Sequence, residues 1–371
     1  VTVTQNPLIG SYQTSSAQTV LTVTGDTTPP TVVSKTTSDS LISDSDVPGP
    51  FTATTTFSEP MSTGATPTIT FSTGVSSTLT FTSGAWSVGN TVYTATYAIA
   101  DGGVTAPSVT FTVSGAADAA TNPQVVDTTA MTPFAIDTEN PTKSSTVSDS
   151  LISDSDVPGP FTVTTTFSET MDTSVAATPV ITFAPDVTST LTFVSGSWNL
   201  ASTVYTASYT IADAGVTVTG VDVTVSGAKD VAGNLDPGTT FDLFSIDTEN
   251  PVLTVPADIR QEADTPTSGT VVFLVTATAP SISCTDDALT PNPVSTTGGT
   301  FALGITTVSC TATDASGNTA SGSFRVTIAE AFITAFPSAK KWDAPFDVSV
   351  LVYGFETGGA ADSIQIRRSV G

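Results

Sequence analysis

A stretch of fifteen residues, SDSLISDSDVPGPFT, occurs twice without a change, at 38–52 and at 148–162. The two copies lie 110 positions apart, and the sequence around each copy repeats as well. The offset is still 110 from Glu59 to Glu169 and grows to 112 further along, so small insertions fall between strand-like segments. Loops accept such insertions better than strands do. The chain is therefore expected to contain two copies of one module, and a fold assigned to it has to repeat.

Apolar and polar residues alternate along each module, as they do in a strand with one buried face. In the first module about seven such runs are separated by Gly, Pro, Ser and Asp turns, and no run has helical periodicity. Seven short strands in roughly 110 residues are typical of an immunoglobulin-like β-sandwich. We therefore predict an all-β chain of tandem immunoglobulin-like β-sandwiches in a linear array. The residues expected to point inward include Phe51, Ala53, Phe57, Ile69, Phe71, Leu79, Phe81, Tyr93, Ala95, Tyr97 and Ile99.

The repeat also suggests domain boundaries. Residues 31–140 form the first immunoglobulin-like repeat and 141–250 the second, each ending in IDTENP, whose proline stops a strand and stiffens a linker. Residues 251–330 change in character and read as a smaller sandwich. Residues 1–30 resemble the last strands of a partial domain plus a linker, and 331–371 hold three strand candidates of another partial domain.

The composition excludes several classes of partner. The 371 residues carry 9 Lys and Arg against 34 Asp and Glu, which gives a net charge of −25. Such a field repels nucleic acid phosphates and anionic lipids, so neither nucleic acid nor direct membrane insertion is expected, and no run of eighteen apolar residues occurs. A Thr-rich, Lys-poor, acidic composition is typical of secreted and surface proteins, so an extracellular or cell-surface location is predicted.

The two cysteines, Cys284 and Cys310, lie in the same later segment. Two cysteines within one module indicate a single disulfide and hence an oxidising compartment. A free or metal-bound pair is the alternative. The chain has no histidine, which excludes Ser-His-Asp and Cys-His catalytic sites and histidine-ligated zinc, and no phosphate-binding glycine loop is present. The protein is therefore expected not to be an enzyme.

The later segment carries a family resemblance. GGTFALGITTVSCTATDASGNTASGSFRVTI resembles the hyalin-repeat (HYR) module, whose signature is G-x-x-F-x-x-G-T-T-x-V-x-C-x-A-x-D-x-x-G-N. Ile305 replaces a usual Thr, and Val255 stands where many members carry an early Cys. The resemblance implies that Cys284 and Cys310 are the cysteine pair of the simpler members. The modules at 31–250 are similar to bacterial and archaeal immunoglobulin-like surface repeats, through FSEPM or FSETMD, SGSWN and AKDVAGN.

Carboxylates recur at three places where one module follows another. The strand order of a seven-stranded sandwich places the B–C and F–G loops at the end where the chain enters, beside the linker. Calcium takes six to eight oxygen ligands, so calcium is the predicted structural cofactor at these linkers, which loosely resemble those of cadherins. Ordinary turn chemistry, in which Asp and Asn side chains bond nearby amides, is the alternative. The predicted ligands are Asp26, Glu59, Asp118 and Asn122; then Asp137, Glu139, Glu169, Asp230 and Asn234; and then Asp247, Glu249, Asp314 and Asn318.

The predicted function is structural. The chain is expected to form part of an extracellular filament, surface layer or stalk, with calcium-stiffened linkers. Copies of the chain are the expected partner, because strands at 1–24 of one copy could complete 331–371 of the next. The alternatives are an adhesin that binds a glycan or protein, and accessory modules of a larger secreted enzyme. Trp86 and Trp198 are expected to plug the core ends rather than to bind sugar.

Overall fold

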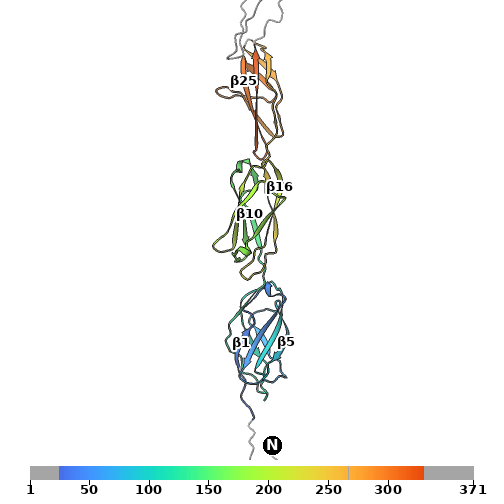
Figure 1. The fold of residues 1–371 in the computed structure, drawn as a ribbon, viewed down its shortest axis with the longest axis vertical. Coiled ribbons are helices and arrows are strands. Elements are labelled where there is room, and N and C mark those ends of the chain that lie inside the picture. Colours follow the sequence, from blue (N-terminus) through green and yellow to red (C-terminus); the bar gives the residue numbers. More distant parts are fainter. Residues whose placement is uncertain (1–24, 266, 330–371) are drawn as a thin grey trace, which may run out of the picture. The chain divides into compact units, whose positions relative to one another are not determined.

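The computed structural model describes residues 25–265 and 267–329. Apart from three single turns of 3-10 helix, the regular structure in these residues is β-strand, which confirms the all-β prediction (Figure 1). They divide into two compact units. The first unit takes in residues 25–141 together with the segment Lys229–Asp236, and the second takes in Thr142–Ala228 and the described residues from Pro237 to Ala329.

The first unit contains one sandwich. Its elements are β1 (Val32–Thr37), β2 (Leu41–Ile42), the 3-10 turn η1 (Asp44–Asp46), β3 (Pro50–Phe57), β4 (Thr68–Phe71), β5 (Leu79–Trp86), β6 (Val92–Ile99), β7 (Thr105–Val109), β8 (Phe111–Ser114) and β9 (Phe134–Asp137). One sheet has the order β1-β3-β6-β5, and it faces the sheet β2-β9-β7 and the pair β4-β8. Because β2 pairs in parallel with β9 while β1 pairs with β3, the chain changes sheet between β1 and β2.

The second unit begins with the repeated sandwich. Its elements are β10 (Lys143–Val147), β11 (Leu151–Ser153), η2 (Asp154–Asp156), β12 (Pro160–Phe167), η3 (Val175–Ala177), β13 (Val180–Ala184), β14 (Leu191–Trp198), β15 (Val204–Ile211), β16 (Thr217–Ser226) and β17 (Thr239–Asp247). The sheets are β10-β12-β15-β14 and β11-β17-β16-β13. Phe161 of one sheet meets Phe244 of the other with ring centroids 4.8 Å apart, so the two sheets share a core.

The same unit holds a smaller sandwich with a disulfide. Its strands are β18 (Leu253–Thr254), β19 (Ile259–Glu262), β20 (Ser268–Val272), β21 (Thr276–Ala277), β22 (Ser281–Thr285), β23 (Pro293–Val294), β24 (Gly298–Ala302), β25 (Gly304–Thr313) and β26 (Thr319–Ala329). The main sheet has the order β19-β26-β25-β22-β23. Cys284 and Cys310 are directly paired residues of β22 and β25, and they form the predicted disulfide.

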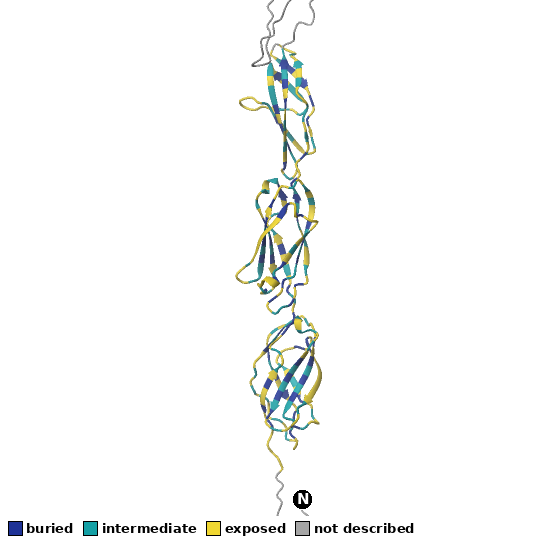
Figure 2. Ribbon diagram, in the orientation of Figure 1, coloured by how far each residue is buried: buried dark blue, intermediate teal, exposed yellow. Residues whose placement is uncertain are grey.

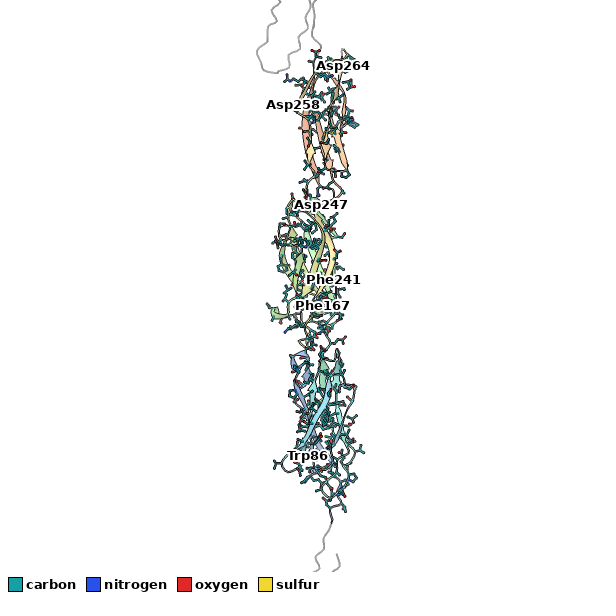
Figure 3. The ribbon with its side chains drawn as sticks, turned by 90° about the vertical axis from the view of Figure 1, so that its right-hand side faces the viewer. Trp86, Phe167, Phe241, Asp247, Asp258 and Asp264 are labelled. Atoms are coloured by element: carbon teal, nitrogen blue, oxygen red, sulfur yellow. A yellow bond between two sulfur atoms is a disulfide. The ribbon has the colours of Figure 1, made fainter. Side chains whose placement is uncertain are left out.

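Each of the three sandwiches has its own hydrophobic core. In the first, the alternating residues of β3 and β6 are buried as predicted, including Phe51 and Tyr93 (Figure 2). Phe81 points inward as predicted, opposite Tyr97 of β6, but it stays 51% exposed. It lies on β5, an edge strand of its sheet, where its ring packs against Tyr97 in a groove that is open to solvent. Trp86 packs against Phe57 beside the core, with ring centroids 5.6 Å apart. Figure 3 labels Trp86 in the first sandwich.

No helix in the described part of the chain is long and apolar enough to cross a membrane.

Gly84 of β5 leaves the space that the hydroxyl of Tyr93 occupies, since a Cβ at Gly84 would overlap that oxygen. Tyr93 is 1% exposed, and its hydroxyl has no hydrogen-bond partner. We expect Gly84→Ala to lower the free energy of unfolding by about 1–3 kcal/mol, the usual cost of overpacking a core. Adding Tyr93→Phe should recover part of this loss in denaturant unfolding. Gly74→Ala is the control, because a Cβ there meets nothing within 4 Å, and equal losses at both glycines would contradict the packing argument.

Candidate functional site: three acidic sets

The same loop follows a strand in each of the three sandwiches. Its aspartate accepts hydrogen bonds from an asparagine four residues later, through both the backbone N–H and the side-chain amide. At Asp118 and Asn122 the distances are 2.8 Å to the backbone nitrogen and 2.6 Å to Nδ2. The equivalent pairs are Asp230 with Asn234 and Asp314 with Asn318. This local turn chemistry fixes each side chain before any ligand is considered.

Each asparagine also holds a linker. Asn122 Nδ2 donates to the carbonyl oxygen of Asp26 at 3.1 Å, and Asn318 Nδ2 donates to that of Asp247 at 2.8 Å. Asn234 lies in the segment Lys229–Asp236, which belongs to the first unit, and its Nδ2 donates to the carbonyl oxygen of Asp137 at 3.0 Å. The linker aspartates predicted from sequence are thus brought to the asparagine loops.

The repeated stretch supplies a further contact that the sequence did not reveal. The backbone N–H of Asp44 donates to Asn234 Oδ1 at 2.9 Å, and that of Asp154 donates to Asn318 Oδ1 at 3.0 Å. In η1 the second aspartate, Asp46, caps the turn by accepting the N–H of Ser43, whereas Asp44 Oδ1 is buried with no hydrogen-bond partner. Asp154 Oδ1 is likewise buried with no hydrogen-bond partner. The two aspartates of SDSD therefore have different roles, one closing the turn and one facing the loop.

These contacts define three acidic sets, each contained within one compact unit. The first set is Asp26, Glu59, Asp118 and Asn122; the second is Asp44, Asp137, Asp230 and Asn234; and the third is Asp154, Asp247, Asp314 and Asn318.

Carboxylates in the first set crowd together. Asp26, Glu59 and Asp118 each offer an oxygen within 4.8 Å of the others, and within the described residues none of the three forms an ion pair with Lys or Arg. Burial, followed by the charges of Asp26 and Asp118, raises the pKa of Glu59. Burial would also raise the pKa of Asp118, but the hydrogen bonds from Asn122 outweigh it and lower that pKa. Asp118 therefore stays charged, and the repulsion among the three carboxylates contributes to the raised pKa of Glu59.

The other two sets show the same electrostatics. Burial first, and then the charges of Asp101, Asp230 and Asp137, raise the pKa of Asp44. Burial also raises the pKa of Asp137, with a further contribution from Asp230. In the third set, burial and then Asp213, Asp314 and Asp247 raise the pKa of Asp154. A bound cation would relieve this repulsion, and an all-oxygen donor set with buried, unpartnered oxygens fits calcium.

The linker glutamates Glu139 and Glu249 lie two residues after Asp137 and Asp247 of these sets. Glu139 and Glu249 are exposed, and each accepts a hydrogen bond from a threonine hydroxyl, from Thr105 at 3.0 Å and Thr217 at 3.1 Å. Glu169 is half-buried in the loop after β12. The predicted strands at 1–24 and 331–371 lie outside the described residues.

The pH dependence of stability follows from these shifts. A raised carboxyl pKa means that the folded state binds protons more readily than the unfolded state, so stability rises as pH falls. In metal-depleted buffer we expect the melting temperature to increase from pH 7 to about pH 4–5, near ordinary carboxyl pKa values. Below that range it should fall, because groups with lowered pKa, such as Asp118, lose their charged form. A melting temperature that falls steadily from pH 7 downward would contradict this electrostatic account.

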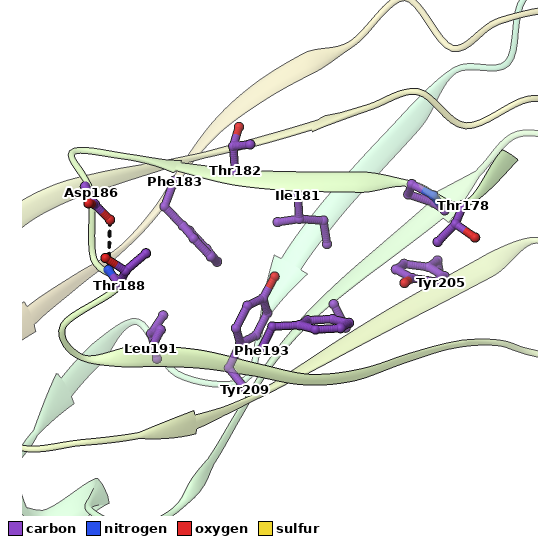
Figure 4. A pocket seen from close by; sticks show the side chains of 12 residues that line it. Thr178, Ile181, Thr182, Phe183, Asp186, Thr188, Leu191, Phe193, Tyr205 and Tyr209 are labelled. Atoms are coloured by element: carbon purple, nitrogen blue, oxygen red, sulfur yellow. Dashed lines mark hydrogen bonds between the residues drawn. The ribbon is translucent and has the colours of Figure 1, made fainter. Parts of the chain in front are cut away.

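A second feature occurs in both repeats, an aromatic groove between the edge strands of the two sheets. In the second repeat it has a volume of ≈ 520 Å³, and the side chains of Ile181, Phe183, Phe193 and Tyr209 line it (Figure 4). The first repeat has a groove of ≈ 600 Å³ lined by the equivalent residues. Phe193 is 56% exposed, so part of this apolar lining faces solvent.

Comparison with known proteins supports the assignment of the third sandwich. The HYR domain model matches residues 246–328. Hyalin of Strongylocentrotus purpuratus is 38% identical over 107 residues, which are 28% of this chain and 8% of that protein. Hyalin of Lytechinus variegatus is 37% identical over 106 residues, 28% of this chain and 19% of that protein. The matched region thus spans less than a fifth of the length of either relative.

Solved structures that match this chain do so at low sequence identity and low TM-score. Protocadherin Gamma B2 extracellular cadherin domains 3-6 have a TM-score of 0.34 at 15% identity, over 80% of this chain and 73% of that one. A structure from a 1.5-MDa bacterial ice-binding adhesin has a TM-score of 0.37 at 16% identity, over 82% of this chain and all of that one. The resemblance of residues 31–250 to bacterial and archaeal surface repeats stays a prediction, whereas residues 246–328 are similar to the HYR domain.

Proposed function

We propose that this chain is a non-catalytic segment of an extracellular array of adhesion-type domains, whose linkers are stiffened by calcium. The observation that carries the proposal is the threefold recurrence of one Asp-x-x-x-Asn loop bonded to an acidic linker. The proposed domains are residues 31–140, 141–250 and 251–330. The HYR match at 246–328 supports a place among secreted or surface proteins.

Calcium would be held by the carboxylates of the three acidic sets, with Glu139, Glu169 and Glu249 as further candidate ligands. The ion would supply charge neutralisation between loop and linker, and the asparagines would orient the linker carbonyls. A linker bound at both sides has fewer accessible conformations than a free one. Copies of the chain are the proposed partner, in a filament or surface layer assembled head to tail by strand addition between 1–24 and 331–371.

Limited proteolysis with a glutamate-specific protease tests the stiffening. Glu139 and Glu249 are exposed linker residues, and we expect calcium to protect both sites from cleavage and EGTA to expose them. Asp230→Asn removes a carboxylate from the second set, so protection should be lost at Glu139 and kept at Glu249. The Glu249 site thereby serves as an internal control in the Asp230→Asn chain. Equal cleavage with and without calcium would overturn the proposal.

The aromatic groove favours a second candidate function, a binding module for a neutral glycan. Aromatic rings offer apolar faces to sugars, and a net charge of −25 disfavours anionic ligands. Retention on a neutral polysaccharide gel should decrease for Phe193→Ala and stay unchanged for Val88→Ala, which alters a fully exposed side chain in the first repeat. Absence of retention for the unaltered chain would reject this candidate.

A further inference from the structure

The first sandwich contains a lysine and an aspartate that are both removed from solvent. Lys35 lies on β1, and its side chain is 3% exposed, whereas that of Asp127 is 1% exposed. Nζ of Lys35 lies 2.9 Å from Oδ2 of Asp127 and also donates to the carbonyl oxygen of Phe111 at 2.8 Å. The amine is therefore fixed against the carboxyl group by two contacts. Removing both charges from water is costly, and such a pair is not by itself a strong source of stability.

The carboxyl group is polarised from its other side. Oδ2 of Asp127 accepts the backbone N–H of Val113 at 3.0 Å, and Oδ1 accepts that of Thr129 at 2.9 Å. The ring of Phe111 lies 5.7 Å from Nζ and helps to exclude water. Backbone N–H groups placed in this way stabilise the oxyanion that forms when a nucleophile adds to a carboxyl carbon.

The second repeat lacks this lysine–aspartate pair. At the position of Lys35 it has Ser145, whose hydroxyl contacts that of Thr165 at 2.9 Å. In the first repeat the equivalent threonine, Thr55, is opposite Lys35, is fully buried and has no hydrogen-bond partner. The second repeat therefore shows that this sandwich forms without a buried lysine. In the first repeat, where Lys35 takes the place of the serine, the hydroxyl of Thr55 has no hydrogen-bond partner.

We propose that Lys35 and Asp127 condense to an intramolecular amide, a covalent cross-link between β1 and the segment that precedes β9. A bond forms between Nζ and Cγ, and one Cγ–Oδ bond breaks. The ammonium loses two of its three protons to the departing oxygen, which leaves as water, so the charges of the pair cancel and no oxidant or activating group is consumed. Fixing two reactants in contact supplies a large effective concentration.

Before Nζ can attack Cγ, one proton passes from Nζ to the carboxylate of Asp127. Burial would raise the pKa of Asp127, but the hydrogen bonds from Lys35, Thr129 and Val113 outweigh it and lower that pKa. The protonated form of Asp127 is therefore the minor one, and the cross-link is expected to form slowly after folding. It would join residues 92 positions apart and so enclose most of the first sandwich in one covalent loop. Tension along the chain would then bypass the strands between them.

Intact mass measurement of the full 371-residue chain, incubated after purification, tests the proposal. The chain should be lighter than its disulfide-bonded sequence mass by about 18 Da, one water, and the difference should be absent in Lys35→Arg. Asp127→Asn should lose about 17 Da instead, because ammonia then leaves in place of water. Trypsin does not cut after an acylated lysine, so the fragment ending at Lys143 should keep the residues on both sides of Lys35.

Dehydration elsewhere is the main source of error, since Asp101 precedes Gly102 and such a pair can cyclise with loss of water. That loss would persist in Lys35→Arg and would leave cleavage after Lys35 intact. A full sequence mass in the unaltered chain, or complete cleavage after Lys35, would overturn the proposal and leave an ordinary buried ion pair.

Discussion

Calcium is expected to raise the melting temperature of this chain, and a chelator is expected to reverse the rise. A ligand that binds only the folded state at a hundredfold excess over its dissociation constant adds about 2.7 kcal/mol per site. The physical reason is the repulsion in the acidic sets, where Glu59, Asp44 and Asp154 all have raised pKa values. Differential scanning calorimetry in metal-depleted buffer, with and without millimolar calcium, measures the shift.

The matched control for this prediction is a chain in which Asp118, Asp230 and Asp314 are all changed to Asn. Asparagine keeps the size of the side chain and one acceptor oxygen for the loop hydrogen bonds, but it removes the charge. Without calcium the variant should melt at a lower temperature, because each loop loses one charged acceptor, and it should gain much less from calcium. If both chains gain equally, calcium acts elsewhere.

Asn318→Ala is expected to have the second largest effect, a loss of about 2–4 kcal/mol, because the buried partners of its side-chain amide, one of them a carboxylate, are left unsatisfied. Asn318 is 1% exposed, and its side chain bonds Asp247, Asp154 and Asp314. Removing it should also release the linker, so cleavage after Glu249 should increase. Denaturant unfolding and proteolysis report the two effects.

Asn122→Ala is the natural comparison. In the residues described, Asn122 bonds Asp26 and Asp118, but it lacks the contact with an SDSD turn that Asn234 and Asn318 have. It is also less buried. Its replacement should therefore cost clearly less than that of Asn318. Equal costs would mean that the contact with the repeated stretch adds nothing to stability.

Much of the fold could be predicted from alternation alone. Phe51 and Tyr93 lie on central strands with one face buried, so their period-2 pattern reports the core directly. Phe81 also points to the predicted face, but alternation could not predict its 51% exposure, because an edge strand leaves that face partly open to solvent. The change of sheet between β1 and β2 could not be predicted either, since both strands are short and pairing partners far along the chain decide it.

The candidate site was harder to predict than the fold. The spacing of Asp118 and Asn122 could be read as a turn, because the hydrogen bonds are local. The contact between Asp44 and Asn234 spans 190 positions, and no local pattern encodes such a distance. The burial of Lys35 was missed for the same reason, since its partner Asp127 lies 92 positions away in a segment without strand periodicity.

Calorimetric titration of the full chain with calcium tests the central claim most directly. The account predicts saturable calcium binding that is lost when Asp118, Asp230 and Asp314 are all replaced by Asn, in a chain that still unfolds cooperatively. Binding that is absent from the unaltered chain, or that survives these three substitutions unchanged, would contradict the claim that the acidic sets hold calcium.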